Sequence, residues 1–366
     1  MSGQSNRGRA MAYAIRLFLV TVLLAASFAV PAQRVEGERA RAVGLYSAEV
    51  TVNGQGPGER NGAFARGLLQ VLQRITGDRA VNGKPGVGDE LRRAREYVDK
   101  YDYRQDEGVS ASGAPSFKTT LVIQYDAEKV GEIIATLGLQ QWPTPRPKPV
   151  LWLAINDGRG PRLVGLAQND AARAVLDRAK ARGYALGLPA GNAAEQALVG
   201  AIWRGDTAAI ARASAKYSPP MQLIGKLYRD PKGGWTADWI FQDAGKVLAR
   251  SSSSDADARR AMAAGADIAA DALIRRYARP AKPLAPPGEF TIAFTGVDST
   301  DDFIRLAAYL ERLAVVKRAT PVSASPDALV YDLELSSGLP GFTRSVVKDG
   351  VLEPAGEEGT TTFRLR

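Results

Sequence analysis

The chain has 366 residues, of which 45% are hydrophobic and 24% are charged, a composition typical of folded globular proteins. It contains no Cys and no His. Disulfide frameworks, the common zinc sites and both Ser-His-Asp and Cys-His catalysis are therefore excluded, whereas a hard-cation site made of carboxylates is not.

The formal net charge is +9. Residues 1–32 hold Arg7, Arg9 and Arg16 and no acid, so without them 45 basic residues stand against 39 acidic ones and the net charge is +6. Such an excess favours anionic surfaces. Acids and bases alternate along the chain without a long basic block, so we interpret it as a well-solvated basic protein and predict no nucleic-acid partner.

The N-terminal residues are typical of an export signal. Arg16 precedes an apolar run over 17–30, and small Ala32 is followed by polar Gln33. This is the three-part layout of a secretory signal peptide, residues 1–32, with cleavage after Ala32. An uncleaved membrane anchor is the alternative, but the run is shorter than the roughly 20 apolar residues that span a bilayer. We therefore predict a periplasmic protein without a lasting transmembrane segment.

Two proline-rich stretches, 143–149 and 280–288, divide the remaining chain. Repeated Pro removes backbone donors and favours extended geometry, so such stretches act as semi-rigid linkers. The sequence thus predicts three modules, 33–142, 150–279 and 289–366, in a protein of mixed α+β and α/β class.

The first module is predicted to be an α+β unit. Its expected elements are a strand over 46–52, a helix over 59–76, a helix over 89–100, a strand over 120–125 and a closing helix over 130–137. The strands alternate apolar and polar residues, and the helices place their apolar residues on one face.

The second module is predicted to be an α/β sandwich with a mixed sheet. The almost continuous apolar run 150–155 suits a strand buried on both faces, and the alternation after it is that of a crossover sheet. The run Ser251 to Ser254 is expected to cap the last helix. The expected elements after the first strand are a helix over 169–182, a strand over 184–188, a helix over 193–217, strands over 221–228, 235–241 and 246–250, and a helix over 255–277.

The third module has the order strand, helix, strand, strand, helix, strand, which is the ferredoxin-like βαββαβ pattern. The expected elements are 290–294, 301–313, 314–319, 329–335, 339–346 and 361–365. The fold has many unrelated uses. Val330, Asp332 and Glu334 would face solvent, where an RNA-binding version would carry aromatic and basic residues, so that use is set aside.

Ser345 and Lys348 have the Ser-x-x-Lys spacing that lets a lysine activate a serine in penicillin-recognising enzymes. The other two elements of those enzymes have no counterpart here beyond Lys348-Asp349-Gly350. We interpret the pair as a solvated helix end.

Asp298, Asp301 and Asp302 lie close enough together to suggest cation ligands. The run Ser299-Thr300-Asp301-Asp302 stands directly before an apolar helix, where a capping residue and acids in the first turn offset the helix dipole. Helix capping is the preferred interpretation.

Two further patterns have a structural interpretation. Gly83-Lys84-Pro85-Gly86-Val87-Gly88 lacks the Ser or Thr that follows the lysine of a phosphate-binding loop, so we interpret it as a loop with positive-φ positions. Trp235, Trp239 and Phe241 could stack on sugars, but their period of two on a covered sheet predicts a core.

Several segments resemble a known family in their residues and order. They are Gly44-Leu45-Tyr46, the helix end Gln70-Val71-Leu72-Gln73-Arg74-Ile75-Thr76-Gly77-Asp78, the Tyr97 to Tyr103 stretch, Leu151-Trp152-Leu153, and Leu223-Ile224-Gly225-Lys226-Leu227 before Trp235. Together they resemble the bacterial envelope family called domain of unknown function 2066, over residues 44–279. The resemblance implies an exported protein of Gram-negative bacteria and brings no activity, ligand or catalytic residue.

These observations predict a periplasmic accessory or scaffold protein that acts by binding an envelope protein and is not an enzyme. No catalytic, cofactor-binding or metal-ligating residue is predicted. Two alternatives stay open. One is a carboxylate-based hydrolase of cell-wall glycan, in which two Asp or Glu residues would face each other at roughly 5–10 Å. The other is binding of peptidoglycan without cleavage.

Overall fold

The structure is a computed structural model that describes residues 44–109, 115–357 and 359–366. All of these belong to one contact unit, 41–366. The predicted signal peptide, 1–32, lies outside the described residues. The described chain is a mixed α+β protein with four β-sheets, and none of its helices is long and apolar enough to cross a membrane.

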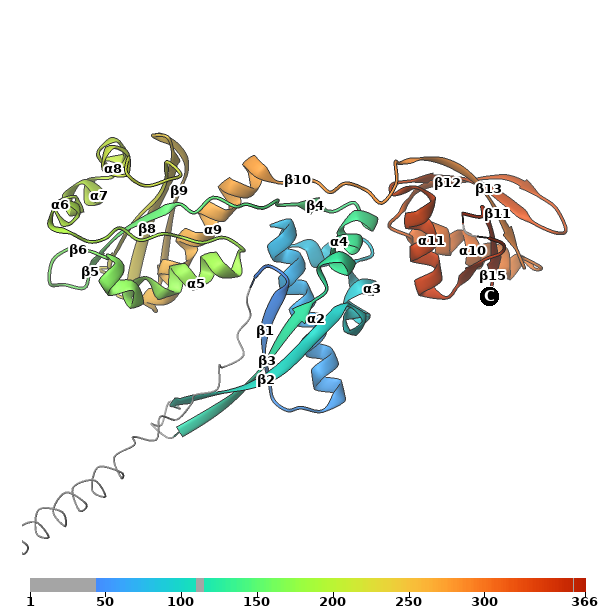
Figure 1. Ribbon diagram of the computed structural model, residues 1–366, viewed down its shortest axis with the longest axis horizontal. Coiled ribbons are helices and arrows are strands. Elements are labelled where there is room, and N and C mark those ends of the chain that lie inside the picture. The colour runs from blue at the N-terminus through green and yellow to red at the C-terminus, as the bar shows by residue number, and fades with distance from the viewer. Residues whose placement is uncertain (1–43, 110–114, 358) are drawn as a thin grey trace, which may run out of the picture. The chain divides into compact units, whose positions relative to one another are not determined.

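The first sheet has three antiparallel strands in the order β1-β3-β2, and α2 covers one face of it (Figure 1). The residues that α2 buries recur at helical spacing and include Phe64, Leu68 and Leu72. Gly77 ends α2 in the left-handed conformation, with φ of 74°. The elements are β1 (Ser47–Val52), α2 (Pro57–Thr76), a 3-10 helix (Val81–Gly83), α3 (Val87–Arg92), a 3-10 helix (Ala94–Tyr97), β2 (Val98–Val109), β3 (Pro115–Tyr125) and α4 (Ala127–Thr136).

The predicted helix over 89–100 is wrong. The helical backbone is interrupted at Arg93, and a strand begins at Val98. Tyr101 and Tyr103 favour strands, and β2 pairs with β3 along eleven residues of each strand, from Val98 to Val109 with one irregularity. Long-range pairing therefore overrides the local helical pattern of Leu91, Ala94 and Val98.

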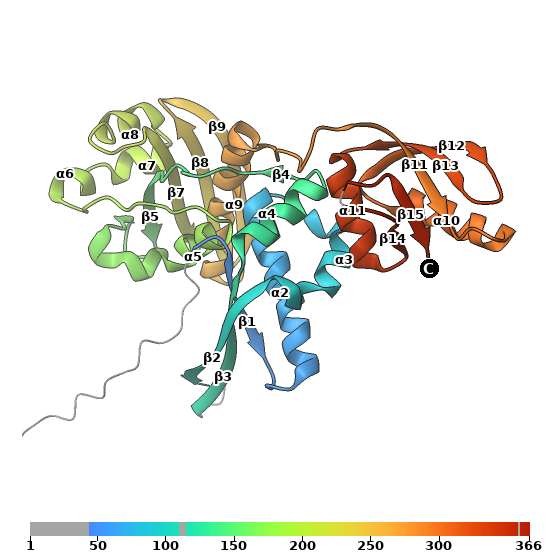
Figure 2. The ribbon, with the colours of Figure 1, turned by 45° about the vertical axis from the view of Figure 1, so that its right-hand side comes forward.

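Strands β2 and β3 continue beyond the reach of β1. The last residue of β1 pairs with Thr119, whereas β2 and β3 stay paired as far as Val109 and Pro115. Figure 2 shows the resulting two-stranded ribbon, which extends past the end of β1.

The second large sheet has the order β6-β5-β7-β8-β9, with β5 and β7 parallel and the other pairs antiparallel. Leu151 and Leu153 of β5 pack in one core with α5 and α9, while Trp152 packs in a second core with α7 and α8. The prediction that this strand is buried on both faces is confirmed. The elements are β5 (Val150–Asn156), β6 (Arg162–Leu163), a 3-10 helix (Leu166–Ala172), α5 (Arg173–Ala181), α6 (Ala193–Gln196), α7 (Val199–Arg204), α8 (Thr207–Ala213), β7 (Met221–Arg229), β8 (Trp235–Asp243), β9 (Lys246–Asp255) and α9 (Ala258–Tyr277).

Three expectations for this region are wrong in detail. The single helix over 193–217 is three short helices, because Gly205 takes a left-handed conformation and Asp206 caps a new helix. The strand over 184–188 is reduced to one bridge between Gly187 and Val150. The helix over 169–182 is α-helical only from Arg173, because a 3-10 helix precedes it.

The serine run Ser251 to Ser254 belongs to β9 and does not cap the following helix. Ser252 donates to Asp238 at 2.6 Å, and Ser254 lies 2.8 Å from the hydroxyl of Thr236 on the neighbouring strand. Ser252 and Ser254 thus have cross-strand partners within the sheet, and Asp257 caps α9 instead.

Trp239 and Phe241 are fully buried, which confirms their interpretation as core residues. The Trp239 ring lies between Gly225 of β7 and Gly265 of α9. A Cβ atom at either glycine would come within 2.1 Å and 2.4 Å of the ring, respectively. The close approach of helix, ring and strand therefore requires glycine at both positions.

The third large sheet has the order β12-β13-β11-β15-β14, in which only β11 and β15 are parallel. Helices α10 and α11 pack their apolar residues on one core with the sheet. Ser299 caps α10 by accepting from the N–H of Asp302, which confirms the capping interpretation. The elements are β11 (Gly288–Thr295), α10 (Thr300–Arg312), β12 (Val316–Ala324), β13 (Leu329–Leu335), α11 (Gly338–Asp349), β14 (Leu352–Pro354) and β15 (Thr362–Leu365).

The residues just before the first proline-rich stretch pair with residues at the start of the second. Strand β4 (Gln140–Gln141) is antiparallel to β10 (Arg279–Pro280). The segment that leads into the second large sheet, here called the central sheet, therefore runs beside the segment that follows it.

Candidate functional site

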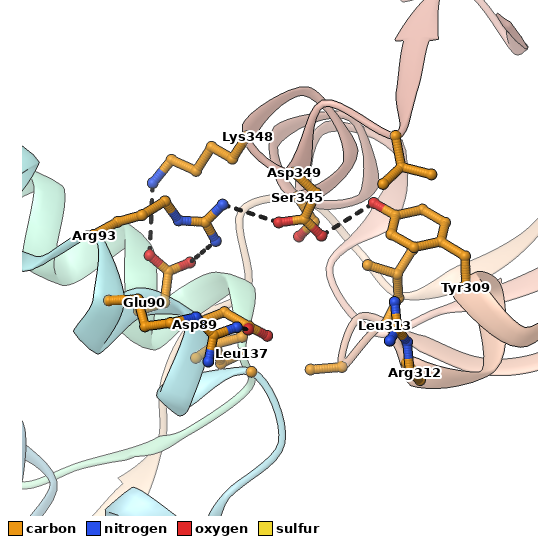
Figure 3. Close-up of a pocket in the computed structure, with 14 residues that line it drawn as sticks. Asp89, Glu90, Arg93, Leu137, Tyr309, Arg312, Leu313, Ser345, Lys348 and Asp349 are labelled. Atoms are coloured by element: carbon orange, nitrogen blue, oxygen red, sulfur yellow. Dashed lines mark hydrogen bonds and ion pairs between the residues drawn. The ribbon is translucent and has the colours of Figure 1, made fainter. Parts of the chain in front are cut away.

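A pocket of about 630 Å³ opens between α3 on one side and α10 and α11 on the other (Figure 3). Its lining is mostly polar, with charges of both signs. The lining residues are Gly86, Asp89, Glu90, Arg92, Arg93, Leu137, Tyr309, Arg312, Leu313, Ala314, Ser345, Lys348, Asp349 and Val351.

Gly86 fixes the position of α3 in this pocket. Its φ is +79°, and a Cβ atom there would lie 2.6 Å from Leu137 and 3.1 Å from Ala314. The turn before α3 therefore approaches Leu137, just after α4, and Ala314, in the connection from α10 to β12, as closely as glycine allows. Helix α3 begins directly after this turn, which places Glu90 of α3 and the following Arg93 next to residues of α11.

A chain of charged side chains crosses the pocket. Arg93 donates to Asp349 at 2.9 Å, and its other terminal nitrogen lies 3.9 Å from Glu90. The ammonium of Lys348 lies 3.7 Å from Glu90. As Figure 3 shows, the side chains from α3 and α11 point toward one another, so the ion pairs join the two parts of the chain.

Two tyrosines complete this network. The hydroxyl of Tyr97 donates to Glu90 and accepts from Lys348 at 2.7 Å. The hydroxyl of Tyr309 donates to Asp349 at 3.0 Å. Each carboxylate therefore has both a cationic and a hydroxyl partner.

Burial and these partners shift the pKa values of four groups in the network. Burial, with the hydrogen bond to Glu90, raises the pKa of Tyr97, and burial next to Asp349 raises the pKa of Tyr309. Burial lowers the pKa of Lys348, and the charges of nearby arginines act in the same direction. For Arg93, burial is outweighed by the hydrogen bond to Asp349 and by the charge of Glu90, so its pKa is raised.

Ser345 and Lys348 both line the pocket, so their interpretation as a solvated helix end is wrong. Lys348 points to Tyr97 and Glu90, whereas the Ser345 hydroxyl donates to the carbonyl of Gly341 at 3.0 Å. The described contacts include no hydrogen bond between Ser345 and Lys348. The geometry that lets a lysine take a proton from a serine is thus not present.

The pocket does bring carboxylates together, as the hydrolase alternative requires. Glu90 and Asp349 are the two that are drawn into its ion-pair network, and Arg93 contacts both. Both carboxylates are engaged by the guanidinium of Arg93 and by a tyrosine hydroxyl, whereas glycoside hydrolysis needs two carboxyl groups that are free to act on a substrate. This arrangement favours holding the two sides of the pocket together over acid-base chemistry.

The other predicted patterns have structural roles in the described residues. The described residues contain no group of three or more Asp or Glu side chains that could hold a metal ion. Asp302 accepts from the Ser299 hydroxyl at 2.7 Å at the start of α10. In the Gly83 to Gly88 segment only Gly86 has positive φ, and the segment contains the turn into α3.

Sequence reasoning did not single out Glu90, Arg93, Tyr97 or Tyr309. Arg93 and Asp349 are 256 residues apart, and Tyr97 and Lys348 are 251 residues apart. No local pattern reports such a pairing. On α11, the Ser-x-x-Lys spacing is a local pattern that includes Lys348, but it suggests activation of a serine and not an ion pair with Glu90.

A second feature is the outer edge of β2. The sheet order β1-β3-β2 leaves this strand of 12 residues without a strand partner on its outer side in the described chain. The backbone N–H of Tyr103 points outward and donates to its neighbour Asp102 at 2.8 Å. On the ribbon, Phe117 is 68% exposed. An unpaired strand edge of this length is a template for pairing with another chain.

Tyr101 belongs to an aromatic and cationic cluster on the same strand. Its ring meets Phe64 at 5.3 Å and Tyr103 at 6.2 Å between centroids, with edge-to-face geometry. The guanidinium groups of Arg60 and Arg95 lie within 5.8 and 6.0 Å of the Tyr101 ring. Tyr101 is itself 39% exposed, so the cluster is open to solvent.

Residues 40–143 match a family model described as Domain of unknown function (DUF8605). The match covers the three-stranded sheet and its helices, and it ends at Pro143, the first residue of the first proline-rich stretch. Comparisons with curated proteins and with solved structures find no match. The resemblance to domain of unknown function 2066 stays a prediction.

Proposed function

We propose that the protein is an exported, periplasmic accessory or scaffold protein that acts by binding another protein of the cell envelope. The observation that carries the proposal is the unpaired outer edge of β2, which continues into the ribbon with exposed Phe117. A partner would add a strand to this edge, so that main-chain hydrogen bonds supply affinity and side chains such as Tyr101 supply specificity.

The charged residues of β2 would limit which strands can pair with its outer edge. Lys100, Asp102, Arg104 and Asp106 carry charges along the strand, and charges on an edge strand oppose pairing with copies of the same chain. A partner with complementary charges would overcome that barrier, whereas a random apolar strand would not.

Photo-crosslinking in living cells tests the proposal. A photoreactive phenylalanine analogue replaces Phe117, and a matched control carries it at Val322, which is 55% exposed on the edge strand β12. We expect one abundant adduct from position 117, identified by mass spectrometry, and none of the same mass from position 322. Adducts that are equal at the two positions, or absent from 117, would contradict binding through the ribbon.

Gln105→Pro sharpens the test. The N–H of Tyr103 points outward, and donors alternate along an antiparallel strand, so the N–H of Gln105 also points away from β3. Proline there removes an outward donor and leaves the pairing with β3 intact. We expect the 117 adduct to be lost while the purified variant still unfolds cooperatively.

We further propose that residues 33–142, 150–279 and 289–366 are separate modules, the second an α/β sandwich and the third ferredoxin-like. The first half of the third supports this, since β13 lies between β11 and β12 and is antiparallel to both, as in a split βαβ unit. Strand β15 lies beside β11 but parallel to it, whereas the fourth strand of the ferredoxin-like pattern is antiparallel to the first. The end of the family match at Pro143 supports the first boundary. Limited proteolysis should cut near 143–149 and 280–288, and one resistant block across both stretches would count against the division.

A further inference from the structure

A second pocket, of about 500 Å³, lies between α2 and α5 and is lined by hydrogen-bond donors. Four of its seven lining residues are arginines and two are glutamines. None of the described lining residues is acidic. They are Gln70, Gln73, Arg74, Arg79, Arg178, Ala181 and Arg182.

Two aspartates of α9 neutralise only part of this charge. Asp267 accepts from Arg178 at 3.0 Å and from Arg182 at 2.6 Å, and Asp271 accepts from Arg182 at 2.7 Å. Arg79 reaches the same two carboxylates only at 3.8 and 3.5 Å, and its side chain is 56% exposed. Three guanidinium groups therefore share two carboxylates.

Arg74 has no carboxylate partner in the described chain. One of its terminal nitrogens donates to three backbone carbonyls, of which that of Ser47 is the closest at 2.7 Å. Its Nε is buried and has no partner there. Burial lowers the pKa of this guanidinium, which means that its charge is held away from water without a compensating anion.

Arg146 adds a further positive charge near Arg74. It donates to the carbonyls of Gly183 and Trp142, both at 2.7 Å, and lies over the Trp142 ring at 4.1 Å. Its Nε is also buried without a partner in the described chain. Burial and the charge of Arg74 lower the pKa of Arg146 to about 10. Arg74 and Arg146 thus add two guanidinium groups, whose hydrogen-bond partners in the described chain are backbone carbonyls, to the three that share Asp267 and Asp271.

We propose that this pocket between α2 and α5 binds the phosphate group of a ligand, through Arg74, Arg79 and Arg178 with help from Gln70 and Gln73. Guanidinium groups present planar pairs of donors that match phosphate oxygens. An anion there offsets the unpaired charge of Arg74. A volume of about 500 Å³ also leaves room for more of the ligand than the phosphate alone.

Phosphate can come from a soluble compound or from a lipid headgroup, and the experiment separates the two. Calorimetric titration of the purified protein with inorganic pyrophosphate at low salt measures binding of the group itself. Sedimentation with phosphatidylcholine vesicles, with and without phosphatidic acid, measures binding of the same group at a lipid surface. The proposal is independent of the strand-edge function argued above.

Arg79→Gln and Arg178→Gln are the test variants, because both side chains are exposed enough to be replaced without opening the core, at 56% and 38%. Glutamine keeps a hydrogen-bond donor and removes the charge. Arg66→Gln is the matched control, since Arg66 lies on α2 but not in the pocket lining, is 50% exposed and pairs with Glu59. Thermal unfolding of all three variants checks that they fold.

We expect each test variant to weaken pyrophosphate binding about tenfold or more, because a hydrogen bond between charged groups is lost, and we expect Arg66→Gln to leave binding unchanged. Binding of phosphatidic acid vesicles with the same pattern would assign a lipid source. Pyrophosphate binding without vesicle binding would assign a soluble one. An absence of binding to both probes, or equal weakening by Arg66→Gln, would overturn the proposal.

Discussion

Two junctions join the first sheet region to the rest of the chain, one to the second large sheet and one to the third, and they differ in the chemistry of their residues. At the first, Trp142 is 1% exposed and packs in the core of the central sheet, while its backbone N–H donates to Ile75 at 2.8 Å. At the second, Ser337 donates to the carbonyls of Ala135 and Thr136, and the charged network of the first pocket lies beside it. The first combines the buried Trp142 ring and backbone pairing with partly exposed ion pairs from Arg79 to Asp267 and Asp271, whereas the second, the polar junction, is made of side-chain hydrogen bonds and ion pairs.

This difference predicts which junction should be more sensitive to salt and pH. The cores of the three large sheets share no buried residue with one another, but Trp142, which follows β4, packs in the core of the second sheet, and β4 pairs with β10. Apolar packing changes little with salt or pH near neutrality, but partly exposed ion pairs weaken as salt rises. Because the polar junction rests on side-chain hydrogen bonds and ion pairs, we expect it to weaken more with rising salt than the first junction, where the Trp142 ring is packed in a core.

Replacement of Trp142 should have the largest effect on stability. Trp142→Ala removes a fully buried ring that contacts Tyr184 and Arg146, so we expect a loss of about 3–5 kcal/mol in the free energy of unfolding. Denaturant unfolding measures it. Trp235→Ala is the control, because Trp235 is only partly buried in the same core and should give a smaller loss. Equal losses would mean that the first junction adds nothing to the central core.

The polar junction should depend on Glu90, which is 7% exposed. Glu90→Gln leaves Lys348 with less compensation for its charge and weakens the contact to Arg93, so we expect a loss of about 2–3 kcal/mol. The loss should appear as faster hydrogen exchange in α11. Asp89→Asn is the control, because Asp89 is half exposed and its ion pair in the described chain is with Arg92, outside the network. Unchanged exchange in α11 would show that the network is not what holds the junction.

The sequence predicts the parts of this molecule whose cause is local. The apolar period of α2, the Ser299 cap of α10 and the apolar run of β5 each report their element directly. Strand β2 was missed because its pairing with β3 overrides a helical pattern. The two junctions were missed for a stronger reason. Their contacts join residues between 64 and 256 positions apart, and no single segment carries a sign of its distant partner.

A buried carboxylate away from both junctions offers a comparison for Glu90. Glu195 in α6 is 3% exposed, and although burial opposes its charge, Lys216, Tyr217 and two backbone N–H groups lower its pKa to about 2. The folded protein thus binds this proton less readily than the unfolded chain, whose value is 4.5. The stabilisation is complete above pH 4.5 and is lost as the pH falls from 4.5 to 2.

We expect Glu195 to contribute about 1–2 kcal/mol over that pH range, since Lys216 is 52% exposed and its charge is screened. Glu195→Gln should flatten the fall of stability with acid, measured by unfolding at several pH values. Arg93 and Lys348 should still hold the polar junction in this variant. If the slope is unchanged, the hydrogen bonds of Glu195 do not distinguish the folded from the unfolded state.

The smallest effect is expected at Ser345, which lies in the polar junction but takes no part in its ion pairs. Its hydroxyl donates to the carbonyl of Gly341 one turn earlier on α11, a bond that adds little to a helix. Ser345→Ala should therefore change the free energy of unfolding by less than about 0.5 kcal/mol. Neither the wild type nor the variant should be labelled by a fluorescent penicillin. Labelling that disappears in Ser345→Ala would mean that Lys348 leaves Glu90 and Tyr97 to activate the serine, and that the polar junction opens to become a reaction site.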